Sequence, residues 1–132
     1  MSHHITNDRV YTTDHEWAKE EGDVVLIGIT AYAVEQLGDI TLVNLDVAEG
    51  DVIEAGKPFG TVESVKTLAD LFAPLSGTIV RVNKAALEER PELVNEDCYG
   101  AAWMVAIAPT DRSVLNGLLD AVAYAKLLET TH

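Results

Sequence analysis

A lysine stands between two short β-prone runs, at the end of the stretch Glu63-Ser64-Val65-Lys66. The run before this stretch covers residues 57–62 and follows Gly56, and the run after it covers residues 67–73 and is followed by Gly77 four residues later. Two such runs that meet at one point predict a β-hairpin. Lys66 would then stand at the tip, where its amine is exposed to solvent. Such an amine can form a stable amide with a carboxylic acid.

The spacing of the turn residues favours a functional interpretation of Lys66. Gly56 lies ten residues before Lys66, and Gly77 lies eleven residues after it. The two arms of the predicted hairpin are therefore nearly equal, which indicates a tip that is held in a set place. An exposed lysine most often serves only solubility, and the residues alone leave that alternative open.

The hairpin resembles the lipoyl-attachment hairpin of the glycine cleavage system H-protein family, on the residues Glu63-Ser64-Val65-Lys66 and the sequence PLSGTIV at 74–80. Further segments resemble the same family in the same order, namely residues 11–17, 28–33, 37–40 and 91–95. The resemblance extends from about residue 11 to about residue 128. Several motifs at the right mutual spacing are more specific than any one of them.

The resemblance implies a role for six side chains. Lys66 would carry lipoate through an amide, and Glu63, Ser64 and Val65 would be read by the lipoylating enzyme. Glu16 and Asp70 would line a cleft that shelters the loaded arm, because a carboxylate stabilises a protonated amine through a charge-assisted hydrogen bond. Polar turn residues at 63–64, and ordinary surface carboxylates at 16 and 70, remain the alternatives.

The function implied by the resemblance is that of a shuttle. The lipoyl arm would carry the aminomethyl group from a pyridoxal-phosphate glycine decarboxylase to an aminomethyltransferase, and would be reoxidised by a dihydrolipoyl dehydrogenase. Tethering raises the effective concentration of the carried group at each enzyme. The chain would be a carrier and not an enzyme, since no nucleophile with a positioned base is found in the sequence.

Other carriers remain as alternatives. Biotin carriers usually place Met on both sides of the modified lysine, whereas here the neighbours are Val65 and Thr67. Lipoyl domains of 2-oxoacid dehydrogenases usually place Asp before the lysine, and they lack the segment 11–17. A lipoyl-relay or regulatory protein of the H type, which binds partners without shuttling aminomethyl groups, is a further alternative.

Composition limits the class of protein. The 132 residues are 48% hydrophobic and predict one domain over 1–132, with residues 1–9 loose. A net charge of −13 disfavours nucleic acid and anionic membranes as partners and favours proteins with basic patches. No signal peptide or membrane span is expected. The single cysteine, Cys98, excludes an internal disulfide and fits the cytoplasm. The scattered histidines predict no metal site, and we expect a monomer.

The elements that would position Lys66 are mainly β-strands. Many short strands with turn signals about every ten residues predict a flattened barrel or sandwich with short peripheral helices. Thr30 is expected to cap a helix at 31–37 that Gly38 ends. Two helices are expected at 111–129, capped by Asp111 and Asp120. The second should pack through Ala121, Val122, Ala125 and Leu128. Trp17 and Trp103 are expected in the core.

Overall fold

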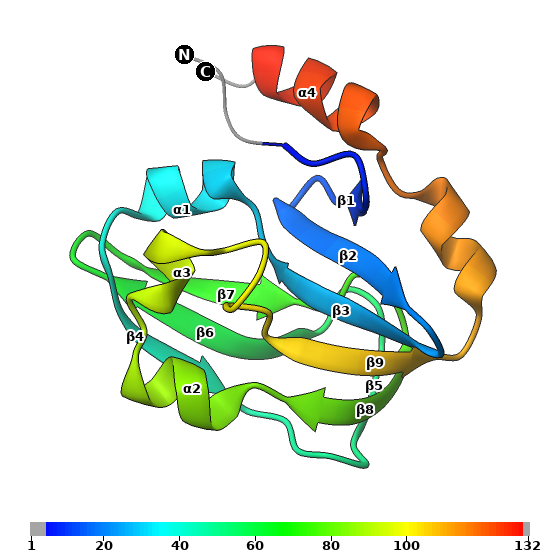
Figure 1. The fold of residues 1–132 in the computed structure, drawn as a ribbon, viewed down its shortest axis with the longest axis horizontal. Helices are drawn as coiled ribbons and strands as arrows, with labels where there is room; N and C mark the ends of the chain where they lie inside the picture. Colours follow the sequence, from blue (N-terminus) through cyan, green and yellow to red (C-terminus); the bar gives the residue numbers. More distant parts are fainter. Residues whose placement is uncertain (1–4, 131–132) are drawn as a thin grey trace.

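The computed structural model describes residues 5–130, which form two β-sheets packed face to face with short helices around them (Figure 1). The larger sheet has the strand order β1-β2-β3-β9-β8-β5 and the smaller has the order β4-β6-β7. All of the pairings are antiparallel. The mainly β fold predicted from the sequence is confirmed, and the two sheets do not close into one barrel.

The strands of the larger sheet are β1 (Val10–Tyr11), β2 (Glu16–Glu21), β3 (Val24–Ile29), β5 (Val52–Ile53), β8 (Gly77–Val82) and β9 (Val105–Pro109). Those of the smaller sheet are β4 (Ile40–Leu45), β6 (Pro58–Ser64) and β7 (Leu68–Phe72). The helices are α1 (Ala31–Leu37), α2 (Lys84–Glu89), α3 (Leu93–Glu96), the 3-10 helix η1 (Arg112–Gly117) and α4 (Ala121–Glu129). Within the described residues, no helix is long and apolar enough to cross a membrane.

Aliphatic side chains from both sheets fill the main core. The strand β3 has the sequence VVLIGI, and its Val25, Ile27 and Ile29 are buried against Val43 and Val62 of the smaller sheet. Strand alternation explains this, because every second side chain points to the same face. The predicted burial of Trp17 is confirmed, since it is 1% exposed. Trp103 is only half-buried, with the guanidinium of Arg81 5.3 Å from its ring centre. It packs against the edge of a buried aromatic cluster and does not lie fully inside the core as predicted.

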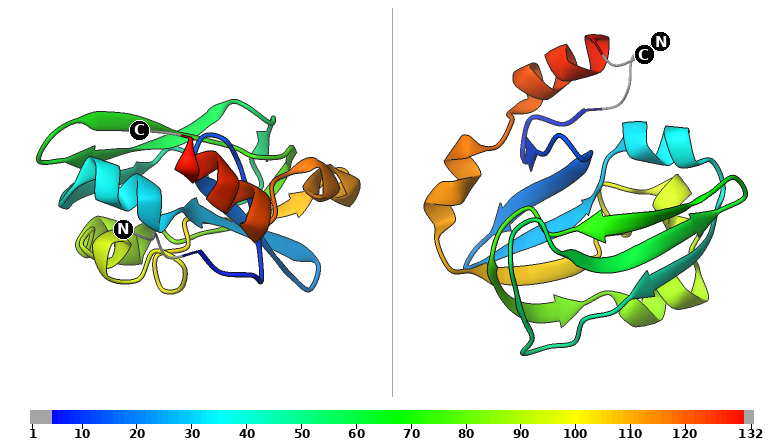
Figure 2. Two further views of the ribbon diagram at one scale, coloured as in Figure 1. Left: turned by 90° about the horizontal axis from the view of Figure 1, so that it is seen from above. Right: turned by 180° about the vertical axis from the view of Figure 1, so that it is seen from behind.

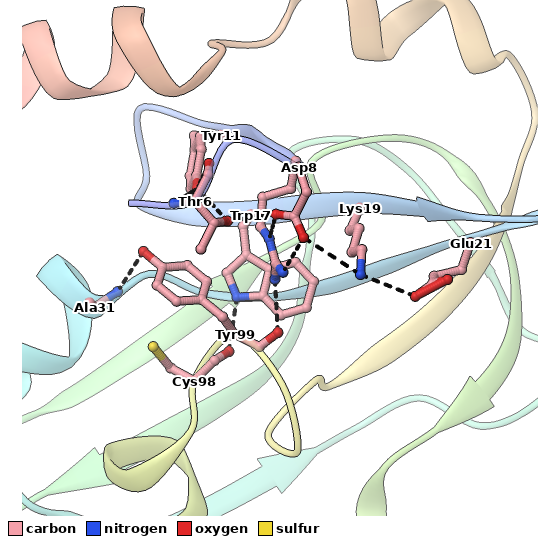
Figure 3. Close-up of polar contacts among 10 residues, drawn as sticks. Thr6, Asp8, Tyr11, Trp17, Lys19, Glu21, Ala31, Cys98 and Tyr99 are labelled. Carbon is pink, nitrogen blue, oxygen red and sulfur yellow. Dashed lines mark hydrogen bonds and ion pairs between the residues drawn. The ribbon is translucent and has the colours of Figure 1, made fainter. Parts of the chain in front are cut away.

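The segment before β1 is held by a second, aromatic cluster. Arg9 is buried, with its guanidinium 4.5 Å from the ring centre of Trp17, and it donates to the carbonyl of Tyr99 at 2.9 Å. Trp17 in turn donates to the carbonyl of Cys98 at 3.0 Å, as Figure 3 shows. The loose segment predicted over 1–9 therefore does not extend to Arg9, and residues 1–4 lie outside the described part of the chain. Burial raises the pKa of the Cys98 thiol to about 11, so the thiol stays protonated at neutral pH.

The C-terminal helix α4 packs against β1, and Figures 1 and 2 show the two lying close together. The ring of Tyr124 stacks on that of Tyr11, with 4.6 Å between their centres. Tyr124 and Leu128 are its buried residues, whereas Val122 is 76% exposed. The predicted packing face was wrong at Val122. The helix instead packs through Tyr124 and Leu128, which are four residues apart and lie on one face.

We expect Tyr124→Phe to lower the free energy of unfolding by about 1–3 kcal/mol, since it removes a buried hydroxyl and leaves its partners unpaired. That hydroxyl lies 2.8 Å from Thr30 Oγ1 and 2.9 Å from His15 Nδ1, while the stacked ring is kept in the variant. Urea unfolding checks this, with Val122→Ala as a control that should change little. Equal stability of wild type and Tyr124→Phe would contradict a stabilising role for the hydroxyl.

Candidate functional site

Lys66 lies in the turn between β6 and β7, and the hairpin predicted from the sequence is confirmed (Figure 2). The Ser64 backbone N–H donates to the Thr67 carbonyl at 2.8 Å and closes the turn. The Ser64 hydroxyl accepts from the backbone N–H groups of Lys66 and Thr67, each at 3.2 Å. Ser64 thus shapes the turn that exposes Lys66. Recognition of Glu63, Ser64 and Val65 by an enzyme stays a prediction.

The turn rests on the segment that joins α1 to β4. Val65 N–H donates to the Asp39 carbonyl at 3.1 Å. The side chain of Lys66 passes Gly38, whose absent Cβ would lie 3.5 Å from Lys66 Cε. Gly38 has a φ of +82°, a conformation that favours glycine, and so ends α1 as its spacing predicts.

Asn95 fixes the segment between α1 and β4 by hydrogen bonds, a role that the sequence did not predict. Its amide nitrogen donates to the Gly38 carbonyl, and its amide oxygen accepts from the Ile40 N–H, both at 2.9 Å. Asn95 belongs to α3, which lies beside α1 (Figure 1). Only its place in the segment 91–95 could have marked it, since hydrogen bonding across more than fifty residues leaves no local pattern. The segment that supports the lysine turn is therefore held by both the nitrogen and the oxygen of the Asn95 side-chain amide.

A groove of about 180 Å³ begins beside this segment, between α1 and the edge strand β7. Its walls include the apolar side chains of Ala33 and Leu37 on α1 and of Leu71 on β7. Leu37 directly precedes Gly38, beside which the Lys66 side chain lies. The groove is therefore next to the lysine, and an arm attached to Lys66 is well placed to enter it.

Two sequence-predicted carboxylates, Glu16 and Asp70, both line this groove. Glu16 is the first residue of β2 and is 2% exposed, whereas Asp70 lies on the edge strand β7 and is exposed. One oxygen of Glu16, Oε2, accepts from the Phe72 N–H at 2.8 Å. The other, Oε1, is buried with no hydrogen-bond partner. The structure brings these two residues together, with Glu16 inside the groove and Asp70 at its rim.

Burial decides the protonation of Glu16. It raises the pKa of the carboxyl to about 8, against the opposing hydrogen bond from Phe72, and the nearby charge of Asp14 adds to the rise. Near neutral pH much of Glu16 is therefore neutral in the empty protein. A cation bound beside Oε1 would favour the carboxylate and lower this pKa.

We expect the contribution of Glu16 to the free energy of unfolding to fall as the pH rises from about 4.5 to about 8 and then to level off. Glu16 keeps its proton in the folded chain up to a pKa of about 8, whereas the unfolded chain releases it near 4.5. Between these values the folded state binds more protons, so a higher pH favours unfolding. The contribution of Glu16 over this range is on the order of 5 kcal/mol, since one pKa unit corresponds to about 1.4 kcal/mol. Urea unfolding at several pH values checks this, and a Glu16→Gln curve as steep as that of the wild type would contradict it.

His15 forms part of the groove wall and has an unusual backbone conformation. Its φ of +67° is uncommon for a residue with a side chain. The conformation is held by its carbonyl, which accepts from Thr30 N–H at 3.0 Å, and by the contact of its ring with Tyr124. Burial lowers the pKa of His15, so its imidazole is neutral at pH 7. His15 thus acts as a structural histidine that fixes the backbone leading to Glu16.

The described residues contain no cluster of three or more His, Cys, Asp or Glu side chains that could hold a metal ion. The polar groups near Lys66 are carboxylates, amides and hydroxyls on fixed backbone. Their arrangement can present an amine, accept a long arm and neutralise one positive charge.

Comparison with known proteins identifies the family. The family model for the glycine cleavage H-protein matches residues 9–131. The chain belongs to this family. It is 54% identical to the glycine cleavage system H protein of Bacteroides thetaiotaomicron, over 86% of this chain and 89% of the relative. It is 51% identical to that of Thermus thermophilus, over 96% and 97%.

A solved structure agrees in fold. The crystal structure of a glycine cleavage system H protein from Mycobacterium marinum superposes with a TM-score of 0.84 at 44% identity, covering 95% of this chain and 99% of that one. The resemblance drawn from the sequence is confirmed. Membership of the family supports a lipoyl-carrying shuttle role in the glycine cleavage system, and a biotinyl carrier, another lipoyl domain or a relay protein is not favoured.

Proposed function

We propose that Lys66 is the lipoyl attachment site of this H-family carrier. Three features support this: the exposure of Lys66 at a hydrogen-bonded turn, the segment that supports the turn and the groove beside it. Lipoate, when bound, supplies a disulfide at the end of a flexible arm that can carry an aminomethyl group and be reoxidised. The residues of this chain present the amine and leave the chemistry to partner enzymes.

The groove is proposed as the resting place of the loaded arm. Its apolar walls suit the hydrocarbon and sulfur atoms of the arm. Glu16 Oε1, buried and without a partner, is the single observation that carries this proposal. An unsatisfied carboxylate oxygen is costly, and the protonated amine of an aminomethyl group would satisfy it through a charged hydrogen bond. Asp70 at the rim would add a second, solvent-screened attraction.

The specific partners proposed are glycine decarboxylase, the aminomethyltransferase, dihydrolipoyl dehydrogenase and the lipoylating enzyme. The chain would catalyse no step itself and would serve these enzymes as a monomeric carrier. Its net charge of −13 favours basic docking surfaces on these enzymes and speeds encounter with them at low salt.

Two measurements test the proposal. The intact mass of protein purified from its native host should exceed the sequence mass by one lipoyl amide, and peptide mapping should place it on Lys66. The lipoylated protein should then support glycine-dependent reduction of the dihydrolipoyl dehydrogenase when mixed with the partner enzymes. Lipoylated protein that fails in this second assay would indicate a relay role instead of a shuttle.

A further inference from the structure

The outer face of the smaller sheet carries side chains that neither the core nor the groove uses. In β4 the residues Val43 and Leu45 point into the core, so Leu42 and Asn44 point outward. In β6, Val62 is buried and Glu63 is exposed. The alternation continues in β7, where Leu71 is buried and Leu68 is exposed.

The strand register places three of these outward residues in one row. Leu42 pairs with Glu63 across β4 and β6, and Glu63 pairs with Leu68 across β6 and β7. The row Leu42–Glu63–Leu68 thus crosses all three strands, with the two leucines about 10 Å apart at two strand spacings. Its last pair, Glu63 and Leu68, flanks the Lys66 turn, with Glu63 three residues before Lys66 and Leu68 two residues after it. The row therefore lies on the strand ends next to the Lys66 turn.

The leucines of this row are unusually exposed for their size. Leu42 is 44% and Leu68 62% exposed, and Val65 in the turn itself is 68% exposed. Among the described residues, the exposed large hydrophobic side chains number seven, and these three gather at one end of one sheet. Exposed apolar residues that are scattered singly need no explanation, but a group of exposed apolar side chains beside polar ones marks a candidate protein-binding surface.

The charge on the smaller sheet indicates which side chains a partner would present to it. The strands β4, β6 and β7 contain no lysine or arginine, and their only charged side chains are Glu63 and Asp70. A carboxylate between two leucines fits a basic side chain flanked by apolar surface. Arg and Lys meet this need, since each combines a cationic head with an apolar stem.

We propose that the row Leu42–Glu63–Leu68 is the docking surface for the enzyme that acylates Lys66. This inference rests on the proposed lipoylation of that lysine. The acylating enzyme must bring its active site to the Lys66 amine itself, so its surface has to cover the turn and the strand ends beneath it. Enzymes that act at the far end of the attached arm have no such need. A basic side chain of the acylating enzyme pairs with Glu63, and its apolar surface covers both leucines.

The test is the rate of lipoylation by a lipoylating enzyme supplied with lipoate and ATP. The double variant Leu42→Ser/Leu68→Ser should lower kcat/KM about tenfold, mostly through a higher KM, because central apolar contacts carry much of the binding energy. Glu63→Gln should lower kcat/KM and weaken its dependence on salt, since one attraction between opposite charges is lost. The exposed leucines do not contribute to the core, so thermal unfolding of the double variant should match the wild type.

The matched control is Val52→Ser/Val122→Ser. These valines are 77% and 76% exposed and lie on β5 and α4, away from the Lys66 turn (Figure 1). This control should be lipoylated at the wild-type rate. A leucine variant that is also lipoylated at the wild-type rate would overturn the docking surface and leave the proposed attachment site intact. Wild-type protein that gains no lipoyl group would instead overturn the proposed function, and this inference with it.

Discussion

Replacing Lys66 by arginine should abolish lipoylation and, with it, all glycine-dependent activity. Arginine keeps the positive charge and a long stem, but its guanidinium stays protonated and does not form the amide. Intact mass after exposure to a lipoylating enzyme should therefore show no gain in the variant and one lipoyl group in the wild type. The turn keeps its shape, because Ser64 and the backbone form its hydrogen bonds.

Stability separates loss of the site from loss of the fold. Lys66 is exposed, so Lys66→Arg should change the free energy of unfolding by no more than about 0.5 kcal/mol. Lys57→Arg is the matched control, since Lys57 is also exposed and lies just before the other end of β6. It should be lipoylated as the wild type is. Full modification of Lys66→Arg would show that a different lysine is used and would remove the basis for the groove beside the turn.

Local chemistry made the hairpin and α1 predictable. Thr30 accepts from Ala33 N–H at 3.2 Å as an N-cap, and Gly38 ends the helix with a positive φ. Both signals act within one turn of the chain, so the sequence displays them directly. Asp120 caps α4 in the same way, with its carboxylate accepting from Ala123 N–H at 2.8 Å. Asp111 also caps a helix, but that helix has 3-10 geometry.

Contacts between distant segments were not predictable in this way. Glu16 is a charged residue at the start of a strand, and nothing nearby in the sequence indicates that it is 2% exposed. It becomes buried because β7, fifty-six residues later, brings the Phe72 N–H to its carboxylate. The resemblance pointed to Glu16 and Asp70, yet only the structure separates a buried carboxylate from an exposed one. The half-burial of Trp103 and the exposure of Val122 depend on tertiary packing in the same way.

Glu16→Gln should shorten the lifetime of the aminomethyl-loaded protein by roughly tenfold to a hundredfold, because a buried charged hydrogen bond contributes about 1.5–3 kcal/mol. Glutamine keeps the size of the side chain and can still accept from Phe72 N–H, but it has no negative charge to hold the ammonium of the carried group. Release of formaldehyde and ammonia from the loaded protein measures this lifetime. Lipoylation should be unchanged, since it takes place at the exposed lysine outside the groove.

The burial of each carboxylate predicts how strongly its replacement should shorten the lifetime of the loaded protein. Asp70→Asn should have a smaller effect, at most about fivefold, because an exposed ion pair contributes only about 0–1 kcal/mol. Glu49→Gln, in an exposed turn away from the groove, is the control and should release the group at the wild-type rate. If Glu16→Gln and Glu49→Gln release it equally fast, Glu16 does not hold the ammonium. The unpartnered oxygen would then have to be explained by the neutral carboxyl group that its raised pKa favours in the empty protein.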